Sequence, residues 1–228
     1  MNDAYPIPGF SEPFSSLSHL LAAGVFLALS FPLLRLGWGN VPKFIALGIF
    51  SFASVFMLSV SGVYHLLSPG GTARVVLQRL DHSAILILIV GTMTPIHQIL
   101  FKGFMRWGWL LLVWLIAITT LTLKNIFFAS FPEWLGLVLF LGLGWFGAVS
   151  AGLLWYQKDK SFIRLLLIGG LAYTVGAILE FVGQPLLIRG VVGPHELFHI
   201  AVLIGLGVHW KFVYDIARTG AFQSLGAR

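Results

Sequence analysis

The chain has 228 residues, of which 58% are hydrophobic and only 10% are charged, whereas soluble domains carry roughly 25% charged residues. So few charged side chains cannot cover a water-exposed surface, which excludes an ordinary soluble domain and indicates a protein that lies in lipid. Cysteine is absent, which excludes disulfides and thiolate chemistry. The net charge of +6 comes from Lys and Arg scattered between apolar runs, which argues against a nucleic-acid partner.

Seven apolar stretches follow one another along the chain, each close to the ~20 residues that span ~30 Å of hydrocarbon. They cover roughly residues 13–36, 42–67, 80–100, 105–123, 133–156, 161–182 and 194–217. No basic residue precedes Arg35, so the first stretch is expected to remain as a helix rather than to be removed as a signal peptide. Because the loops are short, the sequence predicts a single all-α domain over residues 1–228, a seven-transmembrane helix bundle in an integral, multi-pass membrane protein.

The direction of each span decides which histidines can meet, and ionisable groups inside a membrane are costly enough to be functional candidates. We define side A as the membrane face where the first span begins and side B as the opposite face. The second span then ends on side A, and the third and seventh spans begin there. On side A the sequence places His19, His65, Asp81, His82, His195 and His199. His97 comes late in the third span, on side B, and is excluded from this group.

The spacing of the side-A residues predicts a metal site. His195 and His199 are four residues apart in a predicted helix, so their imidazoles lie on one face. Ser61 and His65 repeat that spacing in the second span. Three histidines with an open position for water are a typical catalytic zinc site, so His65 completes the candidate ligand set. Two alternatives remain open at this point: a proton relay of His and Asp side chains in a transporter, and bis-histidine haem ligation.

Three short segments, in this order along the chain, resemble the hemolysin III family, the bacterial branch of the progestin and adipoQ receptor family, within a superfamily that includes alkaline ceramidases. The segments are Ser61-Gly62-Val63-Tyr64-His65, Arg79-Leu80-Asp81-His82-Ser83 and His195-Glu196-Leu197-Phe198-His199. The resemblance implies seven transmembrane helices, a bacterial inner-membrane location, and a Zn²⁺ ion held by His65, His195 and His199. It also implies that Asp81 contacts the zinc-bound water and that Ser61 is the serine of the family's SxxxH motif.

Adiponectin receptors and ceramidases of this superfamily are associated with lipid amide hydrolysis, so the resemblance favours a zinc-dependent hydrolase of a lipid amide or ester. In that interpretation Asp81 is the general base, Ser61 assists the developing oxyanion, and a membrane lipid is the substrate. One alternative is a lipid-sensing, receptor-like protein with structural zinc. Another is a haemolysin or pore, although no span shows the polar stripe that would line a wide aqueous path.

Other polar residues carry weaker expectations. Glu180, late in the sixth span, is expected to join the site or to pair with Arg189 or a neighbouring histidine. His82 departs from the receptor pattern, because the resemblance leads us to expect an aromatic residue at this position. His19, His82 and His209 are expected to be structural hydrogen-bonding groups, with His82 as a rival metal ligand.

The positive charges are divided unequally between the two membrane faces. Side A carries Arg74, Arg79, Lys124 and Arg189, and side B carries the other ten of the 14 Lys and Arg residues. The positive-inside rule therefore predicts that side B faces the cytoplasm and that the metal site lies outside. Adiponectin receptors have the reverse arrangement, with zinc toward the cytoplasm, so charge and resemblance disagree. Arg74 and Arg79 are expected to face lipid headgroups.

Overall fold

The structure, a computed structural model, describes residues 8–157 and 160–219. Its long helices are α1 (Pro13–Arg35), α2 (Val41–Leu66), α3 (Thr72–Leu100), α4 (Phe104–Ile126), α5 (Glu133–Gln157), α6 (Lys160–Val182) and α7 (Pro194–Thr219). A short 3₁₀ turn, η1 (Phe128–Ser130), connects α4 to α5. All seven long helices are apolar enough to cross a membrane, which confirms the predicted fold class. The described residues contain no β-strand, only an isolated bridge between Ile188 and Val192.

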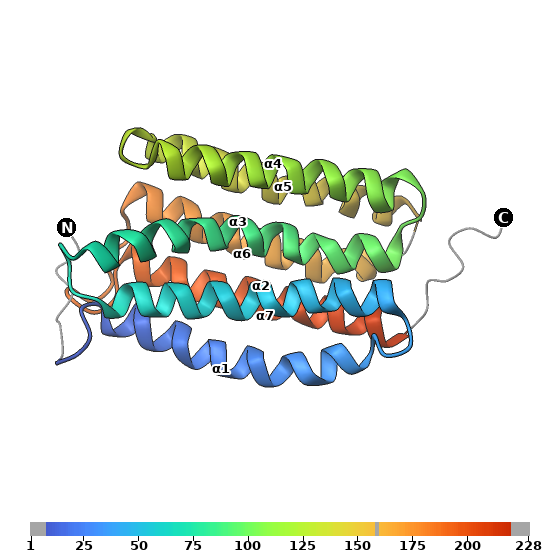
Figure 1. Ribbon diagram of the computed structural model, residues 1–228, viewed down its shortest axis with the longest axis horizontal. Helices are drawn as coiled ribbons and strands as arrows, with labels where there is room; N and C mark the ends of the chain where they lie inside the picture. The colour runs from blue at the N-terminus through green and yellow to red at the C-terminus, as the bar shows by residue number, and fades with distance from the viewer. Residues whose placement is uncertain (1–7, 158–159, 220–228) are drawn as a thin grey trace.

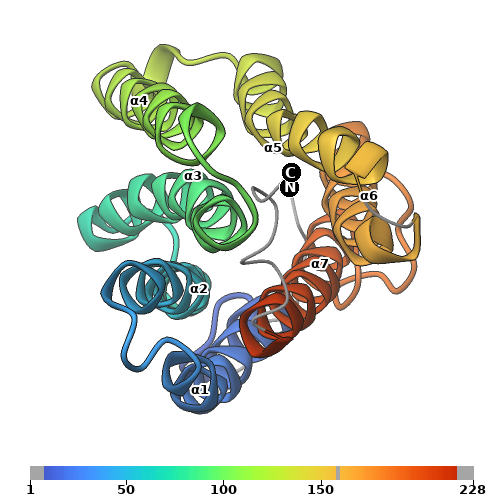
Figure 2. The same cartoon turned by 90° about the vertical axis from the view of Figure 1, so that its right-hand side faces the viewer.

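The helices lie along one long axis and alternate in direction (Figure 1). Helices that are neighbours in sequence pack side by side around the bundle (Figure 2). The last helix closes the arrangement, because α7 contacts α6, α1 and α3. The most central helix is α3, which packs against α2, α4, α5 and α7. This central position places any polar side chain near the start of α3 beside the end of α2 and the start of α7.

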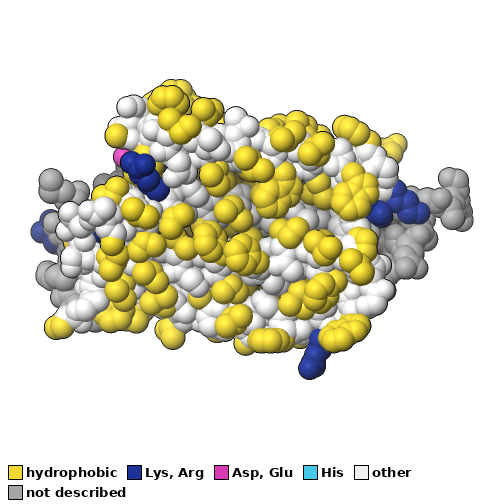
Figure 3. All heavy atoms as spheres, viewed as in Figure 1, with side chains coloured by type: hydrophobic (Ala, Val, Ile, Leu, Met, Phe, Trp, Pro, Cys, Tyr) yellow, Lys and Arg dark blue, Asp and Glu magenta, His cyan; other side chains and the backbone are white. Residues whose placement is uncertain are grey.

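The outer surface is what a lipid environment requires. Figure 3 shows hydrophobic side chains along the length of one face, with Lys and Arg near its two ends. Large apolar side chains such as Leu21, Val25 and Leu111 are exposed along the membrane-spanning length of their helices. Such a surface would aggregate in water, but it matches the hydrocarbon of a bilayer.

At side A, a close contact between α1 and α2 brings their functional ends together. The Ser16 hydroxyl donates to the Gly62 carbonyl oxygen over 2.8 Å. A Cβ atom at Gly62 would lie only 2.7 Å from Leu20 Cγ, so a glycine is what allows this approach. Helix α3 also begins earlier than the predicted third span, at Thr72 rather than near residue 80. The added turns carry Arg74 and Gln78 toward the same end of the bundle.

Candidate metal centre

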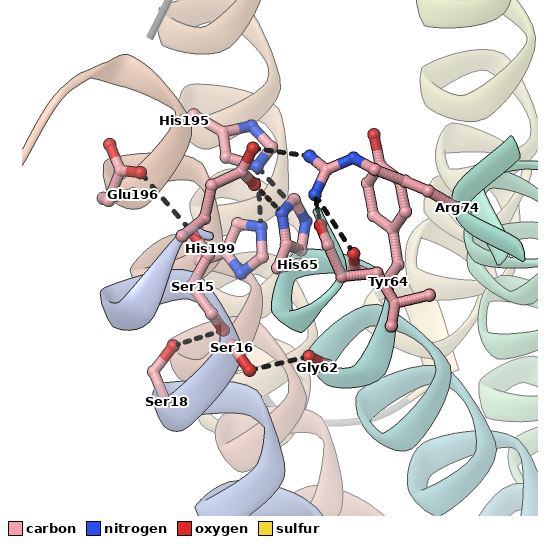
Figure 4. Close-up of polar contacts among 12 residues, drawn as sticks. Ser15, Ser16, Ser18, Gly62, Tyr64, His65, Arg74, His195, Glu196 and His199 are labelled. Carbon is pink, nitrogen blue, oxygen red and sulfur yellow. Dashed lines mark hydrogen bonds and ion pairs between the residues drawn. The ribbon is translucent and has the colours of Figure 1, made fainter. Parts of the chain in front are cut away.

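Three histidines meet at side A of the bundle, one from α2 and two from α7. His65 lies in the last turn of α2, and His195 and His199 lie in the first two turns of α7 (Figure 4). His195 Nε2 lies 3.3 Å from His65 Nε2 and 3.1 Å from His199 Nε2. Ring nitrogens of all three lie within 4.8 Å of one another, so the set could hold one metal ion. We call these three residues the histidine triad.

The spacing of the triad suits tetrahedral coordination. Two nitrogen ligands bound at about 2.0–2.1 Å to a tetrahedral zinc ion lie about 3.4 Å from each other. The separations of His195 Nε2 from His65 Nε2 and from His199 Nε2, 3.3 Å and 3.1 Å, are close to that value. Two of the rings are almost wholly buried, since His65 and His199 are each 2% exposed.

The hydrogen bonds on the outer side of the triad strengthen this fit. Glu12 contacts His65 Nδ1, and Glu180 Oε1 lies 3.0 Å from His195 Nδ1. An ionised carboxylate only accepts hydrogen bonds, so each Nδ1 must donate, and in a neutral imidazole Nε2 is then left with a lone pair. Two lone pairs facing each other repel, and a cation between them removes the repulsion. Carboxylates orient metal-bound histidines in this way in many proteins.

Glu12 and Arg74 tie the start of α1 to the turn between α2 and α3. Arg74 Nη2 donates to Glu12 Oε1 over 2.6 Å, Nη1 donates to the Leu67 carbonyl, and the guanidinium lies 4.7 Å from the centre of the Tyr64 ring. Burial raises the pKa of Glu12, but His65 and Arg74 outweigh that effect and lower it to about 2. The carboxylate is therefore ionised at neutral pH. The expectation that Arg74 faces lipid headgroups is wrong, because its side chain is bonded inside this cluster.

Glu196, between the two α7 histidines, holds the start of that helix in place. Its Oε2 accepts from the Gly193 amide over 2.8 Å, which satisfies one of the free N–H groups at the helix start. Its Oε1 accepts from the Ser15 hydroxyl over 3.3 Å, which ties α7 to α1. One turn later the His199 ring lies on the His19 ring, with 4.0 Å between centroids. His199 Nδ1 is buried without a hydrogen-bond partner in the part of the chain that the structure describes.

Asp81 and Ser61 lie beside the triad. Asp81 on α3 is buried, and the Ser61 hydroxyl on α2 is its side-chain hydrogen-bond partner. Asp81 also interacts electrostatically with His65 and His195. The structure therefore brings together the five residues that the sequence singled out.

A cavity of about 560 Å³ joins these groups and continues through the bundle. At side A its lining includes Ser61, Asp81, His195 and His199, and toward side B it reaches His97 and Ser150. Between these ends the lining is mainly apolar and comes from α3, α5, α6 and α7. The apolar lining residues include Leu88, Ile89, Phe140, Leu141, Phe198 and Val202. A polar end followed by a long apolar interior is the shape that an acyl chain with a polar head would fill.

The remaining polar candidates have distinct surroundings. Glu180 pairs with a histidine, His195, which was one of its two expected partners. His209 Nε2 lies 3.2 Å from the Leu166 carbonyl oxygen, as expected of a structural hydrogen-bonding group. His82 differs, because its Nδ1 is buried without a partner among the described residues and its ring lies 5.6 Å from that of Phe128. His82 lines the cavity, but it is not part of the candidate metal-ligand set of His65, His195 and His199.

Sequence reasoning missed Glu12. It precedes the first predicted span, and no spacing rule connects it with His65, which is 53 residues away. The usable signal was its rarity, because the chain has only 8 Asp and Glu residues and this one stands at the side-A start of a span. The sequence predicts a headgroup position for Arg74, because Glu12 becomes its neighbour only when α1 packs against α2.

The chain has clear relatives. Residues 10–210 match the sequence model of a family described as haemolysin-III related. A protein named hemolysin-3 homolog from Bacillus subtilis (strain 168) is 27% identical over 168 residues, which cover 71% of this chain and 78% of that protein. A protein named hemolysin-3 from Bacillus cereus is 34% identical over 126 residues, or 55% of this chain and 54% of that protein. The family match and the seven apolar helices together identify an integral, multi-pass membrane protein.

Proposed function

Because the chain belongs to the haemolysin-III related family and carries the histidine triad at one end of an apolar cavity, we propose that it is a zinc-dependent membrane hydrolase of a lipid amide or ester. The observation that carries the proposal is the convergence of three imidazole Nε2 atoms beside a buried carboxylate, that of Asp81. Nitrogen ligands without cysteine or methionine sulfur favour zinc over softer metals, and three ligands leave one position open for water.

When bound, zinc lowers the pKa of water toward ~7 and polarises an acyl carbonyl. The chain's own groups supply the proton transfers. Asp81 takes a proton from the attacking water as the carbonyl carbon gains its new oxygen, and then delivers that proton to the leaving amine or alcohol as the carbon–nitrogen or carbon–oxygen bond breaks. The hydrogen bond from Ser61 to Asp81 favours a positioning role for the hydroxyl, because a proton donated to the carboxylate is not free for an oxyanion.

The cavity supports a lipid rather than a water-soluble substrate. Its apolar length lies inside the membrane-spanning part of the bundle, where a fatty acyl chain gains the same burial that it has in the bilayer. With the acyl chain between α3, α5, α6 and α7, the scissile carbonyl would lie at side A, where Asp81, His195 and His199 line the cavity.

The decisive test is turnover by the purified protein loaded with zinc. Fluorogenic N-acyl amides and acyl esters of long fatty acids would be supplied in mixed micelles, and release of the fatty acid would be measured. We expect Asp81→Asn to lower kcat by about 10²–10⁴-fold while the bound metal stays, since that is the usual contribution of a positioned general base. Ser61→Ala should cost less than Asp81→Asn. A zinc-loaded wild type that hydrolyses none of these lipids, yet changes conformation on binding one, would instead support the lipid-sensing alternative.

We further propose that side B faces the cytoplasm, on the strength of the ten Lys and Arg residues assigned there against four on side A. Helix α7 starts on side A and therefore ends, at Thr219, on side B. A green fluorescent protein fused after residue 228 should then fluoresce, and alkaline phosphatase at the same place should be inactive. Active phosphatase with a dark fluorescent fusion would reverse the orientation and place the triad at the cytoplasmic face.

A further inference from the structure

A buried cation, Lys124, stands in the cavity away from the triad. Lys124 lies in the last turn of α4 and is only 9% exposed. A lysine is almost never buried this far without a partner for its charge. In the described part of the chain, no hydrogen bond or ion pair is formed by its ammonium group. Among the described residues, its charge is met only by the faces of Phe131 and Phe140, at 4.9 Å and 5.2 Å from the ring centres, and by the more distant field of Glu133.

The ammonium group is aimed inward, between α4 and α5. A Cβ atom at Gly136 of α5 would lie 3.0 Å from Lys124 Nζ, so the glycine leaves the space that the ammonium group occupies. Lys124, Glu133 and Gly136 all line the same cavity as Asp81 and His195. A lysine near a helix end normally extends to the headgroups. This one turns its three donors toward the interior instead.

Two further polar side chains line the cavity that holds Lys124. Gln78 and His82 stand one turn apart on α3, and both line the cavity. His82 interacts electrostatically with Lys124 and also with His195 and His65. Its buried Nδ1 has no hydrogen-bond partner among the described residues. The same cavity therefore holds an ammonium group without an acceptor and an imidazole whose Nδ1 has no hydrogen-bond partner among the described residues.

We propose that Lys124 and His82 form a subsite for the anionic oxygen group of a lipid headgroup, and that the substrates of this protein are acyl lipids with a phosphate in that position. A phosphate oxygen would supply the acceptor that both side chains lack, and it would neutralise a charge that is otherwise costly to bury. The inference rests on the proposed function in that the ligand is the substrate of the triad. The new element is the lipid headgroup and the two residues that recognise that headgroup.

Binding can be measured without turnover. Full-length protein in a neutral detergent would be titrated with 1-oleoyl lysophosphatidic acid and with 1-oleoyl glycerol, which differ by the phosphate alone, and the dissociation constants compared. We expect the wild type to prefer the phosphate lipid by about tenfold, the equivalent of one buried charge-assisted hydrogen bond. Lys124→Met should remove the preference but still bind 1-oleoyl glycerol, and Lys124→Arg should keep it. His82→Phe should reduce the preference.

Matched controls separate this subsite from general charge effects. Lys102→Met removes an exposed lysine at side B and should leave the preference unchanged. Inorganic phosphate should not compete at concentrations where the lipid binds; effective competition would assign the site to a free anion and overturn the lipid assignment. Equal binding of the two lipids by the wild type, or a preference that survives Lys124→Met, would overturn the subsite.

The same measurement in His199→Ala distinguishes this inference from the proposed function. If the variant and the wild type both hydrolyse nothing but prefer the phosphate lipid, the hydrolase proposal fails and the lipid-binding subsite stands. If the wild type hydrolyses acyl lipids with and without phosphate equally well, and binds them equally, the hydrolase stands and the subsite fails.

Discussion

Buried histidines occur at both ends of the bundle, and their surroundings are opposite in character. At side B, His97 is 1% exposed and both its ring nitrogens are satisfied by neutral groups. Its Nδ1 lies 2.6 Å from the Met105 carbonyl oxygen and its Nε2 lies 2.8 Å from the Ser150 hydroxyl. At side A, two imidazoles of the triad have carboxylates at Nδ1 and other imidazoles at Nε2.

The comparison shows that burial alone does not mark a functional histidine. A carbonyl at one nitrogen and a hydroxyl at the other complete the hydrogen bonds of a neutral ring, so His97 can link α3, α4 and α5 without a ligand. In the triad the hydrogen bonds are incomplete in the absence of a cation, and nearby carboxylates supply negative charge to balance one. The charge of the partners distinguishes the two ends.

The largest expected difference between the ends is in metal content. We expect purified wild-type protein to carry about one zinc ion per chain, and His195→Ala and His199→Ala to lose it, because two ligands hold a tetrahedral ion far more weakly than three. His97→Ala should retain it. Inductively coupled plasma mass spectrometry on detergent-purified protein, after dialysis against a weak chelator, measures the ratio directly.

Either of two outcomes would break the contrast. Unchanged zinc in both α7 variants would remove the triad as a metal site, and loss of zinc from His97→Ala at equal folding would show that the two ends are not independent. Circular dichroism and size-exclusion elution of each variant would establish that folding is equal.

Much of this arrangement follows from sequence because it depends on local patterns and on counting. Seven apolar runs fix the number of helices, and the alternation of their directions places His65 and His195 on the same face although 130 residues separate them. Helical periodicity then puts His199 beside His195. The same counting separates His97 from the group, and the structure finds it bonded near the start of α4.

What sequence could not provide are contacts set by side-chain direction in the packed bundle. Arg74 looks like a headgroup anchor until α1 brings Glu12 to it. Lys124 looks like any cation at a helix end, and only the packing of α5 shows that it turns inward. Both residues lie near a predicted span end, where a long side chain can point to either solvent or protein. Hydrophobic periodicity does not distinguish these two directions.

An intermediate effect is expected for the carboxylates that orient the triad. Glu180→Gln removes the negative charge at His195 Nδ1 but preserves the size of the side chain, and should weaken zinc binding by about 10–100-fold. Glu12→Gln should act similarly through His65. Ser150→Ala, the matched change at the partner of His97, should leave zinc affinity unchanged. Competition with a chromophoric zinc chelator gives the three affinities, and equal values in all three variants would mean that the carboxylates do not support the site.

The smallest expected effect concerns stability, and here the order of the two ends reverses. In protein freed of metal, His97→Leu should lower the free energy of unfolding by about 1–3 kcal/mol, because it leaves the buried Met105 carbonyl and Ser150 hydroxyl without their partner. His199→Leu should cost less, since its Nδ1 has no hydrogen bond among the described residues and its Nε2 faces another imidazole nitrogen. Unfolding by a chemical denaturant in mild detergent measures both.

Adding zinc should then stabilise the wild type and His97→Leu but not His199→Leu, since only a native state that binds the ion gains from it. If metal-free His199→Leu were instead the less stable variant, the triad would be a completed hydrogen-bond network like that around His97. The facing Nε2 atoms would then need no cation between them, because a network that is already satisfied gains nothing from an ion at its centre.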